Sequence, residues 1–123
     1  MRTLTGKRVL ITGGASGIGK SLAQRFAAEG ADLILVDLND TLLQQTAAEL
    51  GAGGRRVRAH AADVTDTAGI LALRDKVHAD GGPIDVLVNN AGLVFGGPFL
   101  ELPLEKHLTT YRVNTMGLVA VTH

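Results

Sequence analysis

The chain has no cysteine, which excludes a disulfide framework and thiolate chemistry. Tryptophan is also absent, and aromatic residues make up only 3% of the sequence. No apolar stretch approaches the roughly 20 residues that cross a bilayer, and the N-terminal residues lead into an apolar run without a signal-type segment. These absences predict a protein without a membrane partner, and we expect it in the reducing environment of the cytoplasm.

Neither sign of charge dominates the sequence. Twelve basic residues balance twelve acidic residues, and neither kind forms a long run. This excludes the basic surface typical of nucleic-acid binding and the polybasic segment typical of membrane anchors. The histidines show no metal-ligand spacing and no serine or cysteine partner; they are His60, His78, His107 and His123. We therefore expect no metal, and a small molecule or a protein as partner.

The sequence is rich in glycine, with 16 residues, and its apolar runs alternate with helical patterns. Continuous apolar runs of the buried parallel-strand type predict strands at residues 8–12, 31–36, 57–62 and 84–88. Apolar residues at helical spacing predict helices at residues 17–29 and 40–50, after the Thr65–Asp66 pair, and from Pro103 onward. Asp40 and the Thr65–Asp66 pair are the predicted caps of the second and third helices.

This alternation predicts the α/β class: right-handed βαβ crossovers, a parallel sheet in the order 3-2-1-4, and a three-layer αβα arrangement of Rossmann type. No linker or internal repeat divides residues 1–123, so we expect one domain. Its last helix still continues at His123, and the fourth strand lies at a bare sheet edge. We therefore expect an incomplete domain that lacks the second half of its sheet, and self-association through the exposed edge.

The segment from Val9 to Gly19, VLITGGASGIG, joins an apolar strand to a helix through glycines. Such a turn lets the backbone pass close to a pyrophosphate, which the N–H groups and dipole of the helix N-terminus attract. Asp37 ends the second strand, 18 residues after Gly19, where a carboxylate accepts hydrogen bonds from an adenosine ribose. A 2′-phosphate would meet the charge of Asp37 without a nearby arginine, so we expect NAD rather than NADP. A ligand-free tight turn and a solvated aspartate are the alternatives.

Further motifs follow in order: Asp63-Val64, the sequence NNAG from Asn89 to Gly92, and Asn114 within a predicted helix. With TGGASGIG at the first turn, the chain resembles the short-chain dehydrogenase/reductase family over essentially its whole length. The resemblance implies cofactor contacts from Gly13, Ser16, Gly17, Ile18 and Gly19 to the pyrophosphate, from Asp37 and Leu38 to the adenosine ribose, from Asp63 and Val64 to the adenine, and from Asn90, Ala91 and Gly92 beneath the nicotinamide-side ribose.

The resemblance also implies that Asn114 kinks its helix and holds a water in a proton relay to a catalytic lysine. Structural alternatives remain open for several of these residues. Asp63 can form a cap or an Asx turn before the next helix, and the Asn89–Asn90 pair is a good turn former. In a helix, Asn114 would ordinarily face solvent.

The family chemistry needs a tyrosine followed four residues later by lysine, and a serine that orients the substrate carbonyl. Tyr111 is the only tyrosine, and Thr115 stands four residues after it. We therefore expect the cofactor-binding half of an NAD-dependent oxidoreductase that moves hydride between nicotinamide and an alcohol or carbonyl substrate. Without the catalytic residues of a C-terminal half, this chain is expected to be inactive. The alternatives are a non-catalytic nucleotide-binding half-module and a truncated fragment.

The glycine-rich loop from Leu93 to Phe99 borders the substrate pocket by the same resemblance. Its apolar side chains indicate a hydrophobic substrate. The alternative, which we favour, is that Phe95 and Phe99 pack against the last helix.

Overall fold

The computed structural model describes residues 3–52, 56–92 and 99–122. Its centre is a four-stranded parallel sheet in the order β3-β2-β1-β4. The strands are β1 (Arg8–Thr12), β2 (Asp32–Asp37), β3 (Val57–Ala61) and β4 (Val86–Asn89). The predicted strand order is confirmed, and each predicted strand differs from the observed one by at most a residue or two at its ends.

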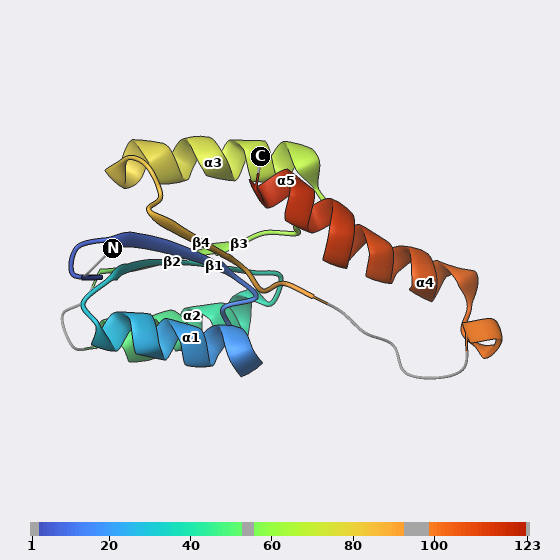
Figure 1. Ribbon diagram of the computed structural model, residues 1–123, viewed down its shortest axis with the longest axis horizontal. Coiled ribbons are helices and arrows are strands. Elements are labelled where there is room, and N and C mark those ends of the chain that lie inside the picture. Colours follow the sequence, from blue (N-terminus) through green and yellow to red (C-terminus); the bar gives the residue numbers. More distant parts are fainter. Residues whose placement is uncertain (1–2, 53–55, 93–98, 123) are drawn as a thin grey trace.

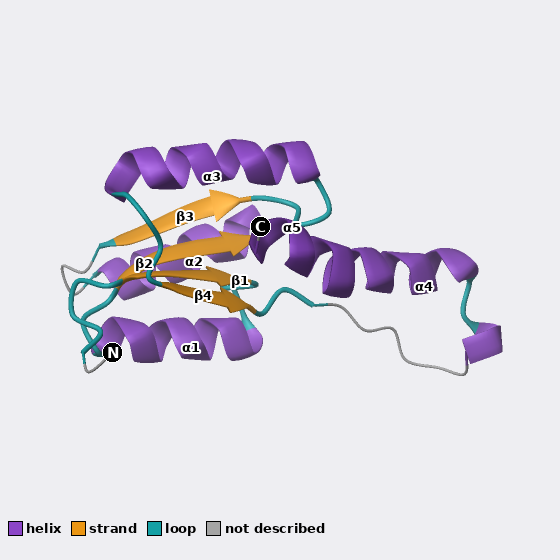
Figure 2. Cartoon of the chain, turned by 45° about the horizontal axis from the view of Figure 1, so that its top comes forward, coloured by secondary structure: helices purple, strands orange, loops and turns teal. Residues whose placement is uncertain are grey.

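Helices cover both faces of this sheet, so the fold has the predicted three layers (Figure 1). On one face lie α1 (Gly17–Ala28) and α2 (Asp40–Gly51), and on the other lie α3 (Thr67–Gly81) and α5 (Leu118–Thr122). The remaining helical segments are a short 3-10 turn η1 (Phe99–Glu101), α4 (Leu104–Tyr111) and a π-helical turn η2 (Arg112–Gly117). Figure 2 shows α4 extending away from the layered body as an arm.

The core lies on both sides of the two central strands. All five residues of β1 are buried, as are the inner residues of β2. Alternate side chains point to opposite faces, so Ile11 and Leu35 pack towards α1 and α2 while Leu10 and Ile34 pack towards α3. This two-sided burial explains why the strands read as continuous apolar runs.

The ends of two helices are fixed by side chains that the turn sequences supply. Asn39 is the N-cap of α2, because its side-chain oxygen accepts from the Leu42 N–H at 3.1 Å. The prediction of Asp40 as this cap is wrong: Asp40 is the first helical residue and accepts instead from the Gln44 side chain at 3.1 Å. Asp66 caps α3 by accepting from the Gly69 N–H at 3.1 Å, as predicted.

The other end of α3 is held by a buried arginine of β1. Arg8 is 9% exposed, and its guanidinium donates to the carbonyl oxygens of Val77, at 3.0 Å, and Gly82. The negative end of the helix dipole lies at this C-terminus, where a cation is favoured. The Arg8 backbone N–H also donates to the Asp85 carboxylate at 2.9 Å. One residue of the central strand therefore fixes both the end of α3 and the start of β4.

Within the described residues, no helix is both long and apolar enough to cross a membrane.

Candidate functional site

The glycines of the first turn let α1 begin very close to the end of β1. Gly13 and Gly17 adopt left-handed backbone angles, with φ of +68° and +56°. Gly19 is required for a different reason: a Cβ there would overlap the Gly13 carbonyl oxygen and lie 2.6 Å from the Asn90 side-chain nitrogen. The turn is therefore built for close backbone approach, as its sequence predicts.

The N-terminus of α1 presents groups suited to an anion. Its N-cap, Ser16, has an extended backbone (φ −158°, ψ 172°), and its side chain makes no capping hydrogen bond. The first turn contains no acidic residue. The first N–H groups of a helix have no partner within it and carry the positive end of the dipole, so this end of α1 favours negative charge.

Asp37 stands beside this turn at the end of β2. One carboxylate oxygen accepts from the Ala15 N–H at 3.0 Å, and the other accepts from the Asn39 N–H at 3.0 Å. These bonds fix the carboxylate between the glycine turn and the start of α2. The next side chain, Leu38, is 72% exposed. The predicted ribose-binding pair therefore consists of a fixed carboxylate and an exposed apolar side chain.

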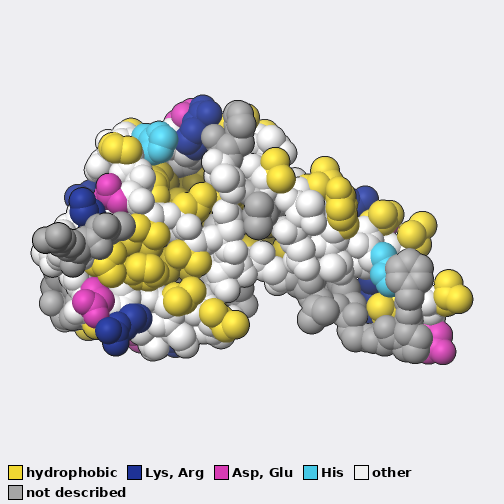
Figure 3. All heavy atoms as spheres, viewed as in Figure 1, with side chains coloured by type: hydrophobic (Ala, Val, Ile, Leu, Met, Phe, Trp, Pro, Cys, Tyr) yellow, Lys and Arg dark blue, Asp and Glu magenta, His cyan; other side chains and the backbone are white. Residues whose placement is uncertain are grey.

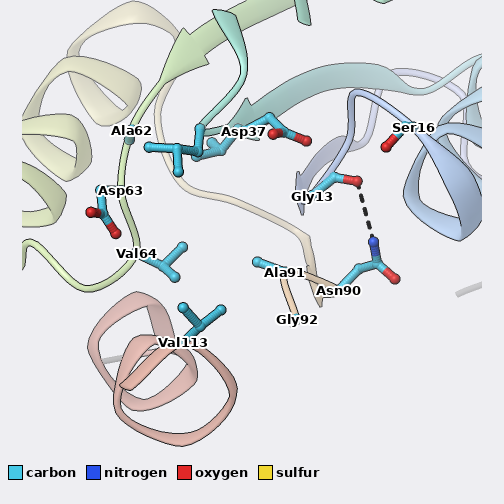
Figure 4. Close-up of a pocket in the computed structure, with 12 residues that line it drawn as sticks. Gly13, Ser16, Asp37, Ala62, Asp63, Val64, Asn90, Ala91, Gly92 and Val113 are labelled. Carbon is cyan, nitrogen blue, oxygen red and sulfur yellow. Dashed lines mark hydrogen bonds between the residues drawn. The ribbon is translucent and has the colours of Figure 1, made fainter. Parts of the chain in front are cut away.

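The turn after β4 is tied to the glycine turn through a buried threonine. The Thr12 hydroxyl oxygen, at the end of β1, accepts from the backbone N–H groups of Asn90, at 3.1 Å, and Ala91, at 3.0 Å. The Asn90 side chain in turn donates to the Gly13 carbonyl oxygen at 3.2 Å (Figure 4). The structural alternative for Asn90 is therefore realised. Asn89 also has a structural contact, from its amide to the Thr122 hydroxyl at 2.8 Å.

The turn after β3 is shaped by an Asx motif. One oxygen of the Asp63 carboxylate accepts from both the backbone N–H of Thr65, at 2.9 Å, and its hydroxyl, at 2.6 Å. The next residue, Val64, is 9% exposed and lies against Gly117 of η2, where a Cβ would come within 2.6 Å of a Val64 methyl group. The Asx alternative for Asp63 is therefore also realised.

These turns surround a cavity of about 400 Å³. Its lining includes most of the predicted cofactor residues: Gly13, Ser16, Asp37, Leu38, Asp63, Val64, Asn90, Ala91 and Gly92. Figure 4 shows these residues arranged around one space, with the end of α1 on one side and η2 on another. The carboxyl ends of all the strands thus meet at one cavity, as expected for a sheet of this topology.

Other predicted residues do not line the cavity. Gly17 and Ile18 are exposed at the start of α1, and Gly19 is buried beneath the turn. Asn114 lies in η2 and is exposed, although a Cβ built on Gly92 would lie 3.5 Å from its side-chain oxygen. The loop segment 93–98, including Phe95, lies outside the described residues, so the expected pocket border and the packing of that loop stay predictions.

The sequence interpretation missed three lining residues: Val36, Ala62 and Val113. Val36 and Ala62 directly precede Asp37 and Asp63, so their position at the ends of strands could have indicated them. Val113 comes from η2, and no local sequence signal places that helix beside the cavity. Thr12 was missed for the same reason, since its bonds join residues far apart in the chain. Among the described residues, no group of histidine and acidic side chains could hold a metal ion.

The parallel sheet, the glycine turn and this cavity define an α/β protein of the dinucleotide-binding type. A family model described as short chain dehydrogenase matches residues 7–123. The chain therefore belongs to the short-chain dehydrogenase/reductase family, as its motifs suggested.

Individual relatives agree with this assignment. The chain is 43% identical over 122 residues to an oxidoreductase, UcpA, of Salmonella typhimurium, a match that covers 99% of this chain and 46% of the relative. It is 42% identical over 114 residues to a D-threitol dehydrogenase of Mycolicibacterium smegmatis, covering 93% of this chain and 44% of that protein. The chain spans about half the length of these curated relatives.

Solved structures show the same fold. A short-chain dehydrogenase/reductase from Burkholderia phymatum in complex with NAD superposes with a TM-score of 0.94 at 33% identity, covering 99% of this chain and 43% of that one. An L-sorbose reductase from Gluconobacter frateurii complexed with NADPH and L-sorbose gives a TM-score of 0.90 at 35% identity, covering 98% and 46%. Of these two similar structures, one is a complex with NAD and the other a complex with NADPH.

Proposed function

We propose that this chain is the NAD-binding half of an oxidoreductase that transfers hydride between nicotinamide and an alcohol or carbonyl substrate. The observation that carries the proposal is the position of Asp37, held at the edge of the cavity by the Ala15 and Asn39 N–H groups. When bound, the nicotinamide cofactor supplies the hydride chemistry, and the protein supplies binding and orientation.

The residues around the cavity fit a dinucleotide part by part. The pyrophosphate would lie at the N-terminus of α1, near Ser16 and the N–H groups of Gly17, Ile18 and Gly19. Asp37 and Leu38 would hold the adenosine ribose, and Asp63 and Val64 would border the adenine. The nicotinamide-side ribose would pass over Asn90, Ala91 and Gly92. Glycine at positions 13 and 17 permits the left-handed backbone of this turn, and glycine at position 19 lets α1 begin directly against it.

We propose NAD rather than NADP as the cofactor because of charge. The Asp37 carboxylate is fixed beside the cavity, and residues 38–40 contain no arginine or lysine to neutralise a 2′-phosphate. Two negative charges about 4 Å apart near a protein surface repel by roughly 4 kcal/mol before solvent and salt reduce the effect. NAD, which has a free ribose hydroxyl there, would instead donate hydrogen bonds to the carboxylate.

Isothermal titration of the 123-residue chain with NAD and with NADP tests both proposals. We expect binding that prefers NAD, and we expect Asp37→Asn to reduce the NAD-to-NADP preference by about tenfold, since it removes the charge and keeps the shape. Asp40→Asn removes a charge from the exposed first turn of α2 and serves as the control. Absence of binding to either nucleotide would refute the cofactor proposal, and an unchanged preference in Asp37→Asn would refute the role of Asp37.

The second candidate function is a non-catalytic nucleotide-binding module or an inactive fragment. It is favoured by the position of Tyr111, which lies in α4 and is followed four residues later by Thr115 instead of lysine. We propose that these 123 residues bind the cofactor without turnover, and that Asn114 acts in a proton relay only with a lysine supplied by further sequence or a partner. Dehydrogenase activity of the purified, mass-verified chain would contradict this proposal. We further propose a cytoplasmic location and a small alcohol or carbonyl compound as substrate.

A further inference from the structure

Thr46 is a buried polar residue of α2 that the cofactor contacts do not explain. Its exposed fraction is 2%, and its hydroxyl donates to the Ala15 carbonyl oxygen at 3.1 Å. A threonine inside a helix commonly donates to a carbonyl of its own preceding turn. Here the acceptor lies 31 residues away, in the glycine turn that precedes α1. The hydroxyl therefore joins α2 to the turn that forms one wall of the cavity.

This hydrogen bond fixes the orientation of a peptide group at the N-terminus of α1. The Ala15 carbonyl and the Ser16 N–H belong to one planar unit, and the described chain contains no cis peptide bond. In a trans unit the two groups point in opposite directions. Holding the carbonyl towards Thr46 therefore turns the Ser16 N–H away from α2 and fixes the backbone of the N-cap residue that lines the cavity.

The preceding peptide group, between Gly14 and Ala15, is held by a different side chain. The Ala15 N–H donates to the Asp37 carboxylate at 3.0 Å. Ala15 itself is 3% exposed, so both its polar backbone groups are buried and both are satisfied by side chains of the next βα unit. Two consecutive peptide groups of the glycine turn are thus held by side-chain hydrogen bonds from outside the turn, one to Asp37 and one to Thr46.

We propose that Thr46 is a positioning residue for pyrophosphate binding, which acts by orienting the Ala15–Ser16 peptide group at the start of α1. The inference rests on the proposed cofactor-binding function. Removal of the hydroxyl leaves the Ala15 carbonyl buried without its partner, so the peptide rotates or the turn moves. The anion-binding end of α1 then loses its geometry, whereas the pocket for the adenosine part keeps its own contacts.

The test compares a ligand that has a pyrophosphate with one that lacks it. Titration calorimetry with ADP and with adenosine gives two dissociation constants for the 123-residue chain and each variant. Thr46→Val keeps the side-chain shape and removes the donor, and we expect roughly five- to tenfold weaker ADP binding, the size of one lost hydrogen bond, with adenosine binding within about twofold of the original. Thr46→Ser keeps a hydroxyl donor at this position, so its ratio of ADP affinity to adenosine affinity should match that of the original chain.

Two control variants on the same helix separate this role from general destabilisation. Thr41→Val makes the same chemical change at an exposed position of α2, and should change neither constant. Leu43→Ala removes a fully buried side chain of α2 and lowers stability without touching the Ala15 carbonyl. We expect it to leave the ratio of the two constants unchanged. If Thr46→Val does not fold, Thr46→Cys keeps the volume with a weaker donor and should show an intermediate ratio.

The outcomes distinguish this inference from the proposed function. If the original chain binds neither ADP nor NAD, the proposed function fails, and the inference fails with it. If the chain binds both but Thr46→Val binds ADP as tightly as the original, Thr46 does not position the anion site. Equal losses for ADP and adenosine, matched by Leu43→Ala, would show a purely structural role and would also overturn the inference.

Discussion

Single charged residues connect the third strand to the helix that covers it. Asp80, in the last turn of α3, accepts from Arg56 at 3.2 Å and from Arg58 at 3.3 Å. Desolvation acts to raise the pKa of Asp80, but the two guanidinium groups outweigh it and hold this pKa below its usual value. Because these side chains are exposed, each pair contributes little on its own. The pKa of His60, in β3, is affected by Asp80 and Arg58 of the same cluster.

We predict that His60 makes the fold less stable as the pH falls. Burial lowers the pKa of His60 below its usual 6.5, Lys76 and Arg58 lower it further, and Asp80 partly opposes them. As the pH falls, the unfolded chain therefore takes up a proton at this histidine before the folded chain does. The loss of stability caused by His60 is absent above about pH 7 and grows from about pH 6.5 downwards. Thermal unfolding of His60→Gln should show a smaller decline between about pH 7.5 and about pH 5.5.

The control for this experiment is His78→Gln, which removes an exposed histidine of α3. It should retain the decline that His60→Gln loses. An identical pH dependence for the original chain and His60→Gln would contradict the prediction.

The predicted residues that line the cavity share a local signal. Gly13, Asp37 and Asp63 each stand where an apolar strand ends, and the end of a parallel strand can be identified from the sequence alone. Thr12 and Thr46 have no such signal, because their hydrogen bonds join segments that meet only after folding. Sequence reasoning therefore identified the lining of the cavity better than the groups that hold this lining in place.

At the scale of elements, the least expected feature is the π-helical turn η2. The apolar pattern after Pro103 predicts one continuous helix, but residues 112–117 widen into a π turn between α4 and α5. This segment contains Asn114, for which the family resemblance implied a kinked helix. It also brings Gly117 against Val64 and Val113 to the cavity wall. Helical periodicity does not distinguish a π turn from the surrounding α-helix, so this detail could not be derived from the sequence.

We predict that Gly117→Ala lowers both stability and adenosine affinity. The added Cβ would lie 2.6 Å from a methyl carbon and 3.0 Å from the Cβ of Val64, so η2 or Val64 must move. Overpacking of this kind costs about 1–3 kcal/mol in the free energy of unfolding, which urea denaturation measures. Titration with adenosine should show weaker binding, because Val64 lines the proposed adenine site.

Two further variants establish the cause. Gly51→Ala, at the end of α2, adds a Cβ that meets no described atom within 4 Å apart from its chain neighbours and its own helix backbone, so it should be neutral or slightly stabilising. In the double variant Val64→Ala/Gly117→Ala the space returns, and the combined loss should be smaller than the sum of the two single losses. Additive losses would show that the contact between these residues is not responsible.

In the whole molecule, helices cover the faces of the sheet, but one edge of the sheet is exposed. Both faces of β1 and β2 are covered, but β4 pairs with β1 on one side and with no strand of the described chain on the other. Figure 3 shows hydrophobic atoms along the helical arm. The exposed apolar side chains of α4, η2 and α5 include Leu104, Leu108, Tyr111, Met116 and Val119. An open strand edge with unpaired backbone groups is a template for pairing with another strand.

We predict that the purified chain self-associates through the edge of β4. Alternate N–H groups of a parallel strand point to opposite sides, so amides that face β1 and amides that face outwards should alternate along Val86–Asn89. In dilute solution, hydrogen exchange should therefore be slow and fast in turn along β4. At high concentration, the fast amides should slow by about tenfold or more as edges pair, while amides of the central β2 stay unchanged. Sedimentation velocity on the same samples gives the association state. A monomer at the highest concentration would contradict the prediction. Association without new protection in β4 would show that the contact uses another surface, and the exposed apolar side chains of the arm would be tested next.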